Sequence, residues 1–130
     1  MTVKPSIDLT PEVALDLLAK AVAKRGEDYV YEKLDYASGL ECRYAHRGAP
    51  SCLVGEVLFE AGITLAALVR FDRDEIGNPS ALVDTDSLDI PFATAFALDR
   101  AQQAQDTGKT WGAALQAARD YVADNRTENA

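Results

Sequence analysis

Residues 91–122 read PFATAFALDRAQQAQDTGKTWGAALQAARDYV, and this stretch decides the fold. Pro91 suits the start of a helix, and small or apolar side chains follow it at helical spacing. Gly108 ends that helix, and Thr110 then offers a capping oxygen to a second helix. Because so short a connection brings neighbouring helices together, we expect an antiparallel helical hairpin that turns over residues 106–109.

Upstream, residues 11–25 form the clearest single helix. Thr10 offers an N-cap oxygen, Pro11 fits the first helical position, and Gly26 fits the end. Two shorter helices are also predicted, one from Pro50 or Ser51 to Gly62 and one capped by Thr64.

Between these helices, residues 29–36 and 40–46 are rich in aromatic and branched side chains, which predicts two strands. Residues 37–39 can turn the chain, so a β-hairpin is the simplest pairing. Residues 47–50 are expected to break the second strand. Strand alternation would place four side chains of that strand on one face, namely Leu40, Cys42, Tyr44 and His46.

The 130 residues therefore predict one α+β domain, mainly helical, with one β-hairpin and a C-terminal helical hairpin. Residues 1–9 and 126–130 are expected to be loose. Residues 72–89 are expected to form an acidic loop, with six acids and one base, in a chain of net charge -8. Its two Asp-x-Asp pairs lack the further oxygen ligands of a calcium loop, so no metal site is predicted. A weak divalent-cation site between the pairs stays open as an alternative.

The acidic balance argues against a protein that wraps nucleic acid, because such proteins need surplus Lys and Arg. No apolar run approaches the roughly 20 residues that span a bilayer. The first residues, 1–6, also lack the plan of a secretion signal. We therefore expect a cytoplasmic protein without a cofactor, without membrane attachment and without direct nucleic-acid binding.

Cys52 is the residue with the most reactive expected environment. In the first turn of a helix, main-chain N–H groups favour the thiolate, and His46 is the single histidine and lies near it in sequence. The favoured interpretation is nevertheless a packed thiol. Cys42 and His46 would lie about 13 Å apart along a strand, so they could not share a zinc ion within one chain. A zinc site shared between subunits stays open.

Tyrosines gather in the predicted hairpin. Tyr29, Tyr31 and Tyr44, together with Arg43, are our candidate binding residues, because aromatic residues and Arg dominate protein interfaces. The same tyrosines would equally suit a half-buried core. An exposed ribbon edge also needs cover, so a homodimer is plausible.

Two segments carry a resemblance, residues 42–58 (CRYAHRGAPSCLVGEVL) and residues 101–115 (AQQAQDTGKTWGAAL). Together they resemble a group of short uncharacterised proteins encoded by actinobacteria and their phages. The resemblance implies a source and a size class, and it brings no activity, cofactor or catalytic residue. It also suggests that the helix within residues 50–58 packs against the corner at residues 105–111.

Three functions remain in view. The first is a small intracellular protein-binding or regulatory protein, encoded by a bacterium or a phage, whose partner is another protein or a second copy. The second is a thiol-dependent enzyme or redox sensor that uses Cys52 with His46. The third is an acidic mimic of nucleic acid. Because the catalytic signals are weak, we favour the first function.

Overall fold

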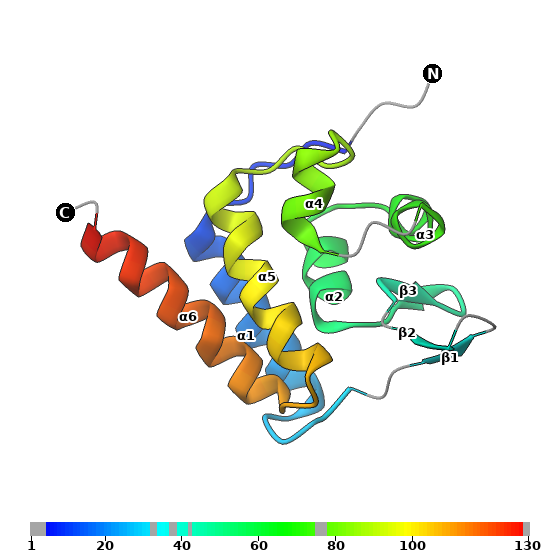
Figure 1. Cartoon of the computed structure of the whole chain (residues 1–130), viewed down its shortest axis with the longest axis horizontal. Coiled ribbons are helices and arrows are strands. Elements are labelled where there is room, and N and C mark those ends of the chain that lie inside the picture. Colours follow the sequence, from blue (N-terminus) through cyan, green and yellow to red (C-terminus); the bar gives the residue numbers. More distant parts are fainter. Residues whose placement is uncertain (1–4, 32–33, 37–38, 42, 75–77, 129–130) are drawn as a thin grey trace.

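A computed structural model of the chain describes residues 5–31, 34–36, 39–41, 43–74 and 78–128. Within these ranges it contains six helices and four short strands (Figure 1). In chain order they are α1 (Pro11–Arg25), β1 (Leu34–Tyr36), β2 (Gly39–Glu41), β3 (Ala45–His46), β4 (Ala49–Pro50), α2 (Leu53–Glu60), α3 (Leu65–Arg73), α4 (Pro79–Asp84), α5 (Phe92–Asp106) and α6 (Trp111–Glu128). The predicted class, a mainly helical α+β domain, is confirmed.

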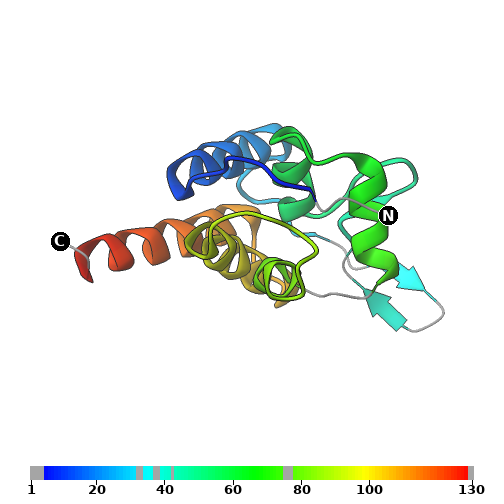
Figure 2. The same ribbon diagram turned by 90° about the horizontal axis from the view of Figure 1, so that it is seen from above.

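The two C-terminal helices form the predicted helical hairpin. α5 and α6 lie side by side and run in opposite directions, with α1 packed against both (Figure 1, Figure 2). The chain turns at Gly108, whose φ of 87° is a backbone conformation that favours glycine. α2 lies between α1 and α5 and so links the helical hairpin to the rest of the molecule.

The helix starts follow the predicted capping residues. The side-chain oxygen of Thr10 accepts the Val13 N–H at 3.2 Å, and Thr110 caps α6 in the same way. α2 begins at Leu53, slightly later than expected. Its cap is Cys52, whose sulfur accepts the Gly55 N–H at 3.3 Å.

The strands are shorter than predicted and form two separate ladders. β1 and β2 pair antiparallel, with Leu34 opposite Glu41, and this hairpin projects away from the helices (Figure 1, Figure 2). Residues 47–50, expected to break the strand, instead turn it back, so that β3 pairs with β4. Arg47 and Gly48 have φ values of 51° and 79°, which is the left-handed conformation of a two-residue hairpin turn.

This second ladder changes which side chains face inward. Tyr44 and Ala45 are neighbours in sequence and both are buried, so the predicted alternation does not run through to His46. Cys42 lies outside the described residues. Tyr29 and Tyr31 precede the first strand rather than forming part of it.

Residues 75–77 lie outside the described residues, and the rest of the acidic segment is more ordered than the predicted loop. α3 continues to Arg73, and α4 occupies residues 79–84. Asn78 caps α4, because its side-chain oxygen accepts the Ala81 N–H at 2.9 Å. Pro79 then occupies the first helical position, which suits its fixed φ.

The described part of the N-terminal segment is also anchored rather than loose. Ser6 pairs with Asp89 through an isolated parallel bridge and donates a side-chain hydrogen bond to it at 2.9 Å. Leu9 is buried, and its carbonyl oxygen accepts the Thr94 hydroxyl at 2.6 Å. At the other end, α6 continues to Glu128, beyond the expected start of the loose tail.

The core is built from aliphatic side chains and many alanines. α5 turns a face of small residues inward, including Ala97 and Ala101, which lets neighbouring helices approach closely. Trp111 is the largest fully buried side chain and lies beneath the corner between α5 and α6. Among the described helices, none is long and apolar enough to cross a membrane.

Candidate functional site

Tyr29, the first of the predicted binding residues, belongs to a cluster at the start of α6. Its ring meets Trp111 edge-on, with centroids 4.7 Å apart, and its carbonyl oxygen accepts the main-chain N–H of Trp111 at 2.8 Å. Arg25 donates to the Tyr29 hydroxyl and forms an ion pair with Glu56 at 3.1 Å. Tyr29 therefore joins the end of α1 to the start of α6, and it is half-buried in doing so.

Tyr31 and Tyr44 are buried, so neither ring is accessible to a binding partner of the protein. The Tyr31 hydroxyl lies 2.8 Å from the Ser51 hydroxyl, just ahead of α2. Tyr44 packs edge-on against Phe71, and its hydroxyl donates to Gln102 on α5 at 3.3 Å. These two tyrosines occupy the core, the alternative role that the sequence left open for them.

Arg43, the fourth predicted residue, is half-buried and donates to the Asp72 carbonyl oxygen at 3.4 Å. The Asp72 carboxylate itself accepts the Tyr44 N–H at 2.9 Å and the Ala45 N–H at 3.0 Å. Asp72 therefore binds β3 to α3. The sequence did not predict this role, because Asp72 stands among other acidic residues there.

The environment of Tyr44 has a chemical consequence. Burial raises the pKa of its phenol well above the usual value of 10.0, and the nearby Cys52 and Asp72 raise it further. The hydrogen bond to Gln102 acts in the opposite direction but does not cancel the effect of burial. The phenol therefore stays protonated in the folded chain to a higher pH than in an exposed tyrosine, which suits a structural side chain.

Cys52 is 1% exposed, so its sulfur lies out of reach of a substrate in solution. Reactive cysteines combine N–H donors to the sulfur with partial exposure, and Cys52 has the donor from Gly55 without the exposure. His46 is half-buried and lies on β3, at the rim of an open hollow beside α3.

The acidic side chains do not gather into a metal site within the described parts of the chain, where no group of three or more candidate ligands occurs. Asp72 is engaged by main-chain N–H groups, as above. Asp89 accepts the Ser6 hydroxyl, and Asp84 is exposed at the end of α4.

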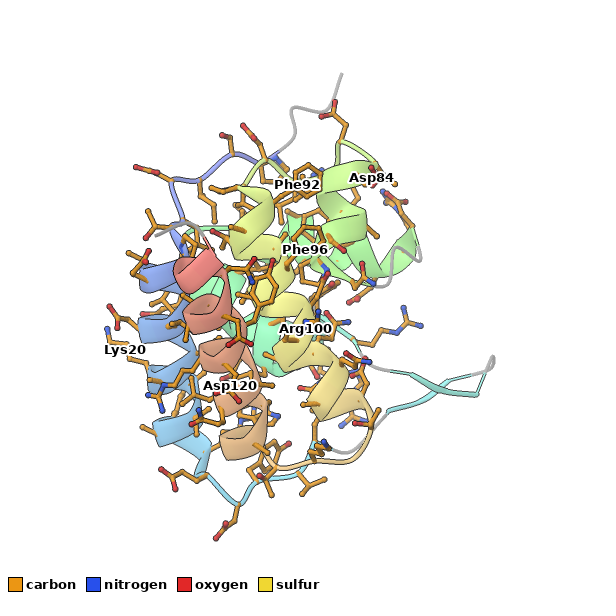
Figure 3. All side chains as sticks on the ribbon, turned by 60° about the vertical axis from the view of Figure 1, so that its left-hand side comes forward. Lys20, Asp84, Phe92, Phe96, Arg100 and Asp120 are labelled. Carbon is orange, nitrogen blue, oxygen red and sulfur yellow. The ribbon has the colours of Figure 1, made fainter. Side chains whose placement is uncertain are left out.

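The helical hairpin carries an exposed aromatic surface, which we call the α5–α6 face and define by Phe92, Phe96, Arg100 and Tyr121. Phe92 and Phe96 are 50% and 41% exposed, and their rings stack with centroids 5.8 Å apart. The Tyr121 ring of α6 lies 6.3 Å from the Phe96 ring, and the Arg100 guanidinium lies 5.5 Å from the Tyr121 centroid. Figure 3 shows Phe92, Phe96 and Arg100 following one another along α5.

A groove adjoins this face at Phe96. Its volume is about 540 Å³, and its walls include Asn78 ahead of α4 and Asp99, Gln103 and Asp106 on α5. The Asp99 carboxylate accepts the Ser80 N–H at 3.0 Å, which fixes one wall to α4. The aromatic face and the groove therefore form a continuous surface with an apolar part and a polar part, and the polar part contains two carboxylates and Arg100.

The sequence placed Phe92 and Phe96 one helical turn apart but did not identify them as a surface. A signal was present: the residues between and after them, such as Ala97 and Ala101, already complete a buried face made of small side chains. Phe92 and Phe96 lie outside this buried face of α5 and are therefore left on the surface.

The corner predicted from the resemblance is confirmed as a contact. The Leu53 N–H at the start of α2 donates to the Gln105 side-chain oxygen at 2.9 Å, and both residues are buried. Gln105 thereby satisfies one of the N–H groups that the first turn of a helix leaves without a partner in the helix.

Comparisons with known proteins identify no relative. No protein-family model matches the chain, no curated protein matches it, and no solved structure matches it.

Proposed function

We propose that the chain is a small protein-binding module that docks a partner on the α5–α6 face. The observation that carries the proposal is the stacked pair Phe92 and Phe96, half-exposed and joined by Tyr121 and Arg100. Aromatic residues and Arg are enriched at interfaces, where they supply large contact area at a low cost in conformational entropy.

The charge around the face favours a basic partner. Asp99 and Asp106 line the adjoining groove, against the single cation Arg100 among the groove's described residues, and the whole chain has a net charge of -8. Figure 3 shows Asp84 and Asp120 on either side of the labelled α5 residues. Two copies of so acidic a chain repel each other, whereas a segment with apolar residues between Lys or Arg is attracted.

As the sequence led us to expect, we propose that the protein is cytoplasmic and comes from actinobacteria or their phages. The thiol function gains no support, because Cys52 is buried. Mimicry of nucleic acid gains none either, because Asp72 is used to bind β3 to α3 and Asp89 is used to hold Ser6.

A phage-displayed library of random linear peptides tests the proposal. The library is selected against the wild-type chain and against the double variant Phe92→Ser/Phe96→Ser. We expect enriched peptides that combine aromatic or aliphatic residues with Lys and Arg. The double variant should bind them more than about tenfold more weakly, since central interface residues contribute about 2 kcal/mol or more.

The matched control is Val13→Ser/Phe59→Ser, which removes side chains that are 43% and 44% exposed on α1 and α2. It should bind the selected peptides as the wild type does. Equal losses in both variants, or enrichment of acidic peptides, would overturn the proposal. Sedimentation equilibrium adds a second decision: a dimer that Phe92→Ser/Phe96→Ser dissociates would assign the face to a second copy rather than to a basic partner.

A further inference from the structure

The groove beside Phe96 offers an open carboxylate oxygen. Asp99 on α5 lines this groove and is half-buried. One of its carboxylate oxygens accepts the Ser80 main-chain N–H at 3.0 Å, and the other accepts no hydrogen bond from any described residue. A carboxylate that accepts one N–H keeps its negative charge and further lone pairs, so Asp99 remains an acceptor for a cation.

The bond from Ser80 also holds this carboxylate in place. Ser80 stands in the first turn of α4, where Asn78 caps the helix by accepting the Ala81 N–H, and the Ser80 N–H finds its partner in Asp99. Asp99 therefore ties α5 to the start of α4. Its second oxygen is positioned before a ligand arrives, which reduces the entropy lost on binding.

The neighbours of Asp99 along α5 differ in where they lie. Gln103 follows it by one helical turn, on the same face, and its exposed side chain makes no hydrogen bond with a described residue. Arg100 also lines the groove, but adjacent residues of a helix do not face each other. Its guanidinium lies 5.5 Å from the centroid of the Tyr121 ring, an attractive contact on the side of α6.

We propose that the groove binds one Lys or Arg side chain of the segment that docks on the α5–α6 face, an inference that rests on the proposed function. Phe96 belongs to both the aromatic face and the groove, so a single segment reaches both. The cation donates to the open oxygen of Asp99 and to the amide oxygen of Gln103. Among the described lining residues, two carboxylates, Asp99 and Asp106, stand against Arg100, so one added cation balances the charge.

Positions along α5 set the spacing within the bound segment. Asp99 lies about 5 Å beyond Phe96 along the helix axis and Gln103 about 10 Å beyond it, at about 1.5 Å per residue. An extended peptide covers about 3.3 Å per residue. The basic residue should therefore stand about two or three positions from the apolar residue that contacts Phe96.

The test uses short synthetic peptides that carry this spacing. The probes are acetyl-Leu-Trp-Ser-Lys-amide and the same four residues in reverse order, titrated into ¹⁵N-labelled protein at constant ionic strength. Matched peptides carry norleucine in place of lysine, which keeps the apolar stem and removes the ammonium group. For the order that binds more tightly, we expect norleucine to weaken binding about fivefold, because a half-buried ion pair is partly screened by water.

Variants assign that difference to the groove. Asp99→Asn keeps an oxygen for the Ser80 N–H and removes the charge, so the two peptides should bind it within about twofold of each other. Gln103→Met removes an amide from an exposed side chain away from α4 and should reduce the difference about twofold, which decides the question if Asp99→Asn fails to fold. Asp16→Asn, the matched control, removes one charge from the exposed surface of α1 and should keep the fivefold difference.

Equal binding of the lysine and norleucine peptides to the wild type would overturn this inference, as would a difference that persists in Asp99→Asn and Gln103→Met or disappears equally in Asp16→Asn. The proposed function is decided separately by Phe92→Ser/Phe96→Ser, which should weaken both peptides. Weakening by that variant without a lysine effect would retain the aromatic face and reject the groove. A lysine effect that depends on Asp99, without weakening by that variant, would retain the groove and reject the face. Absence of binding by every peptide would overturn both.

Discussion

At Gly55 the backbone of α2 lies directly against the carbonyl group of Tyr44. A Cβ placed there would collide with the Tyr44 carbonyl oxygen and would lie 3.0 Å from the Tyr44 Cα. In an ordinary helix interior, replacing Gly by Ala stabilises by roughly 1 kcal/mol. Here we expect the opposite sign, because Gly55→Ala must push the main chain of the hairpin segment away. The free energy of unfolding should fall by about 1–3 kcal/mol.

Urea denaturation of Gly55→Ala measures this change. Gly112→Ala provides a graded comparison, since its Cβ would lie 2.9 Å from the Glu27 carbonyl oxygen, a less severe approach. We expect a smaller loss there. A gain of stability at Gly55 would show that α2 and the hairpin segment are not in close contact.

At the scale of elements, Asp72 decides how the β3–β4 hairpin is held. Asp72→Asn replaces one carboxylate oxygen with an amide group that donates, and that group would face a main-chain N–H of Tyr44 or Ala45. We expect a loss of about 1–3 kcal/mol in the free energy of unfolding. Faster amide hydrogen exchange at Tyr44 or Ala45 should accompany it, at whichever of the two N–H groups faces the new amide group.

Asp74→Asn is the matched control, since it makes the same charge change two residues later on an exposed side chain. Its effect should stay within about 0.5 kcal/mol of the wild type. If both variants lost equal stability, charge rather than the Asp72 bonds would be the cause.

The helices were more predictable than the strands because their signals are local. Thr10 marks the start of α1 and Gly26 marks its end, and each acts within one turn of the helix. α4 carried the same kind of signal in Asn78 and Pro79, but the acidic composition around them indicated a loop. Strand pairing depends on partners farther along the chain, so the sequence did not show where the first ladder ends and the second begins.

The site was less predictable than the fold, because composition does not determine which aromatic residues are buried. Tyr31 and Tyr44 suited an exposed ribbon, yet both are buried, Tyr31 beside Ser51 and Tyr44 against α3 and α5. Phe92 and Phe96 suited a core, yet small residues on the opposite face of α5 already fill it. In both cases the tertiary neighbours decide, and these are not visible in a single sequence.

At the scale of the whole molecule, the raised pKa of Tyr44 couples stability to alkaline pH. In the unfolded chain a tyrosine releases its proton near pH 10, whereas the folded chain retains it to higher pH. The folded state therefore binds more protons above about pH 10, and the free energy of unfolding should fall as pH rises through that range.

Tyr44→Phe removes this coupling together with the phenol. Urea denaturation from about pH 8 to pH 11 should show a shallower alkaline decline for the variant than for the wild type. Tyr121→Phe, which removes a hydroxyl from the α5–α6 face, serves as the matched control. An alkaline decline of Tyr44→Phe equal to that of the wild type would contradict the assignment to Tyr44.

The hydrogen bond between Leu9 and Thr94 joins residues 85 positions apart, and the bond between Leu53 and Gln105 joins residues 52 positions apart. Each hydrogen bond closes a long loop of chain, and the entropy cost of closing the loop must be met before the contact can stabilise it. The α5–α6 hairpin needs no such closure, so we expect it to form before α2 and the N-terminal segment dock on it. The chain should consequently fold more slowly than a helical bundle of the same size whose contacts are all local.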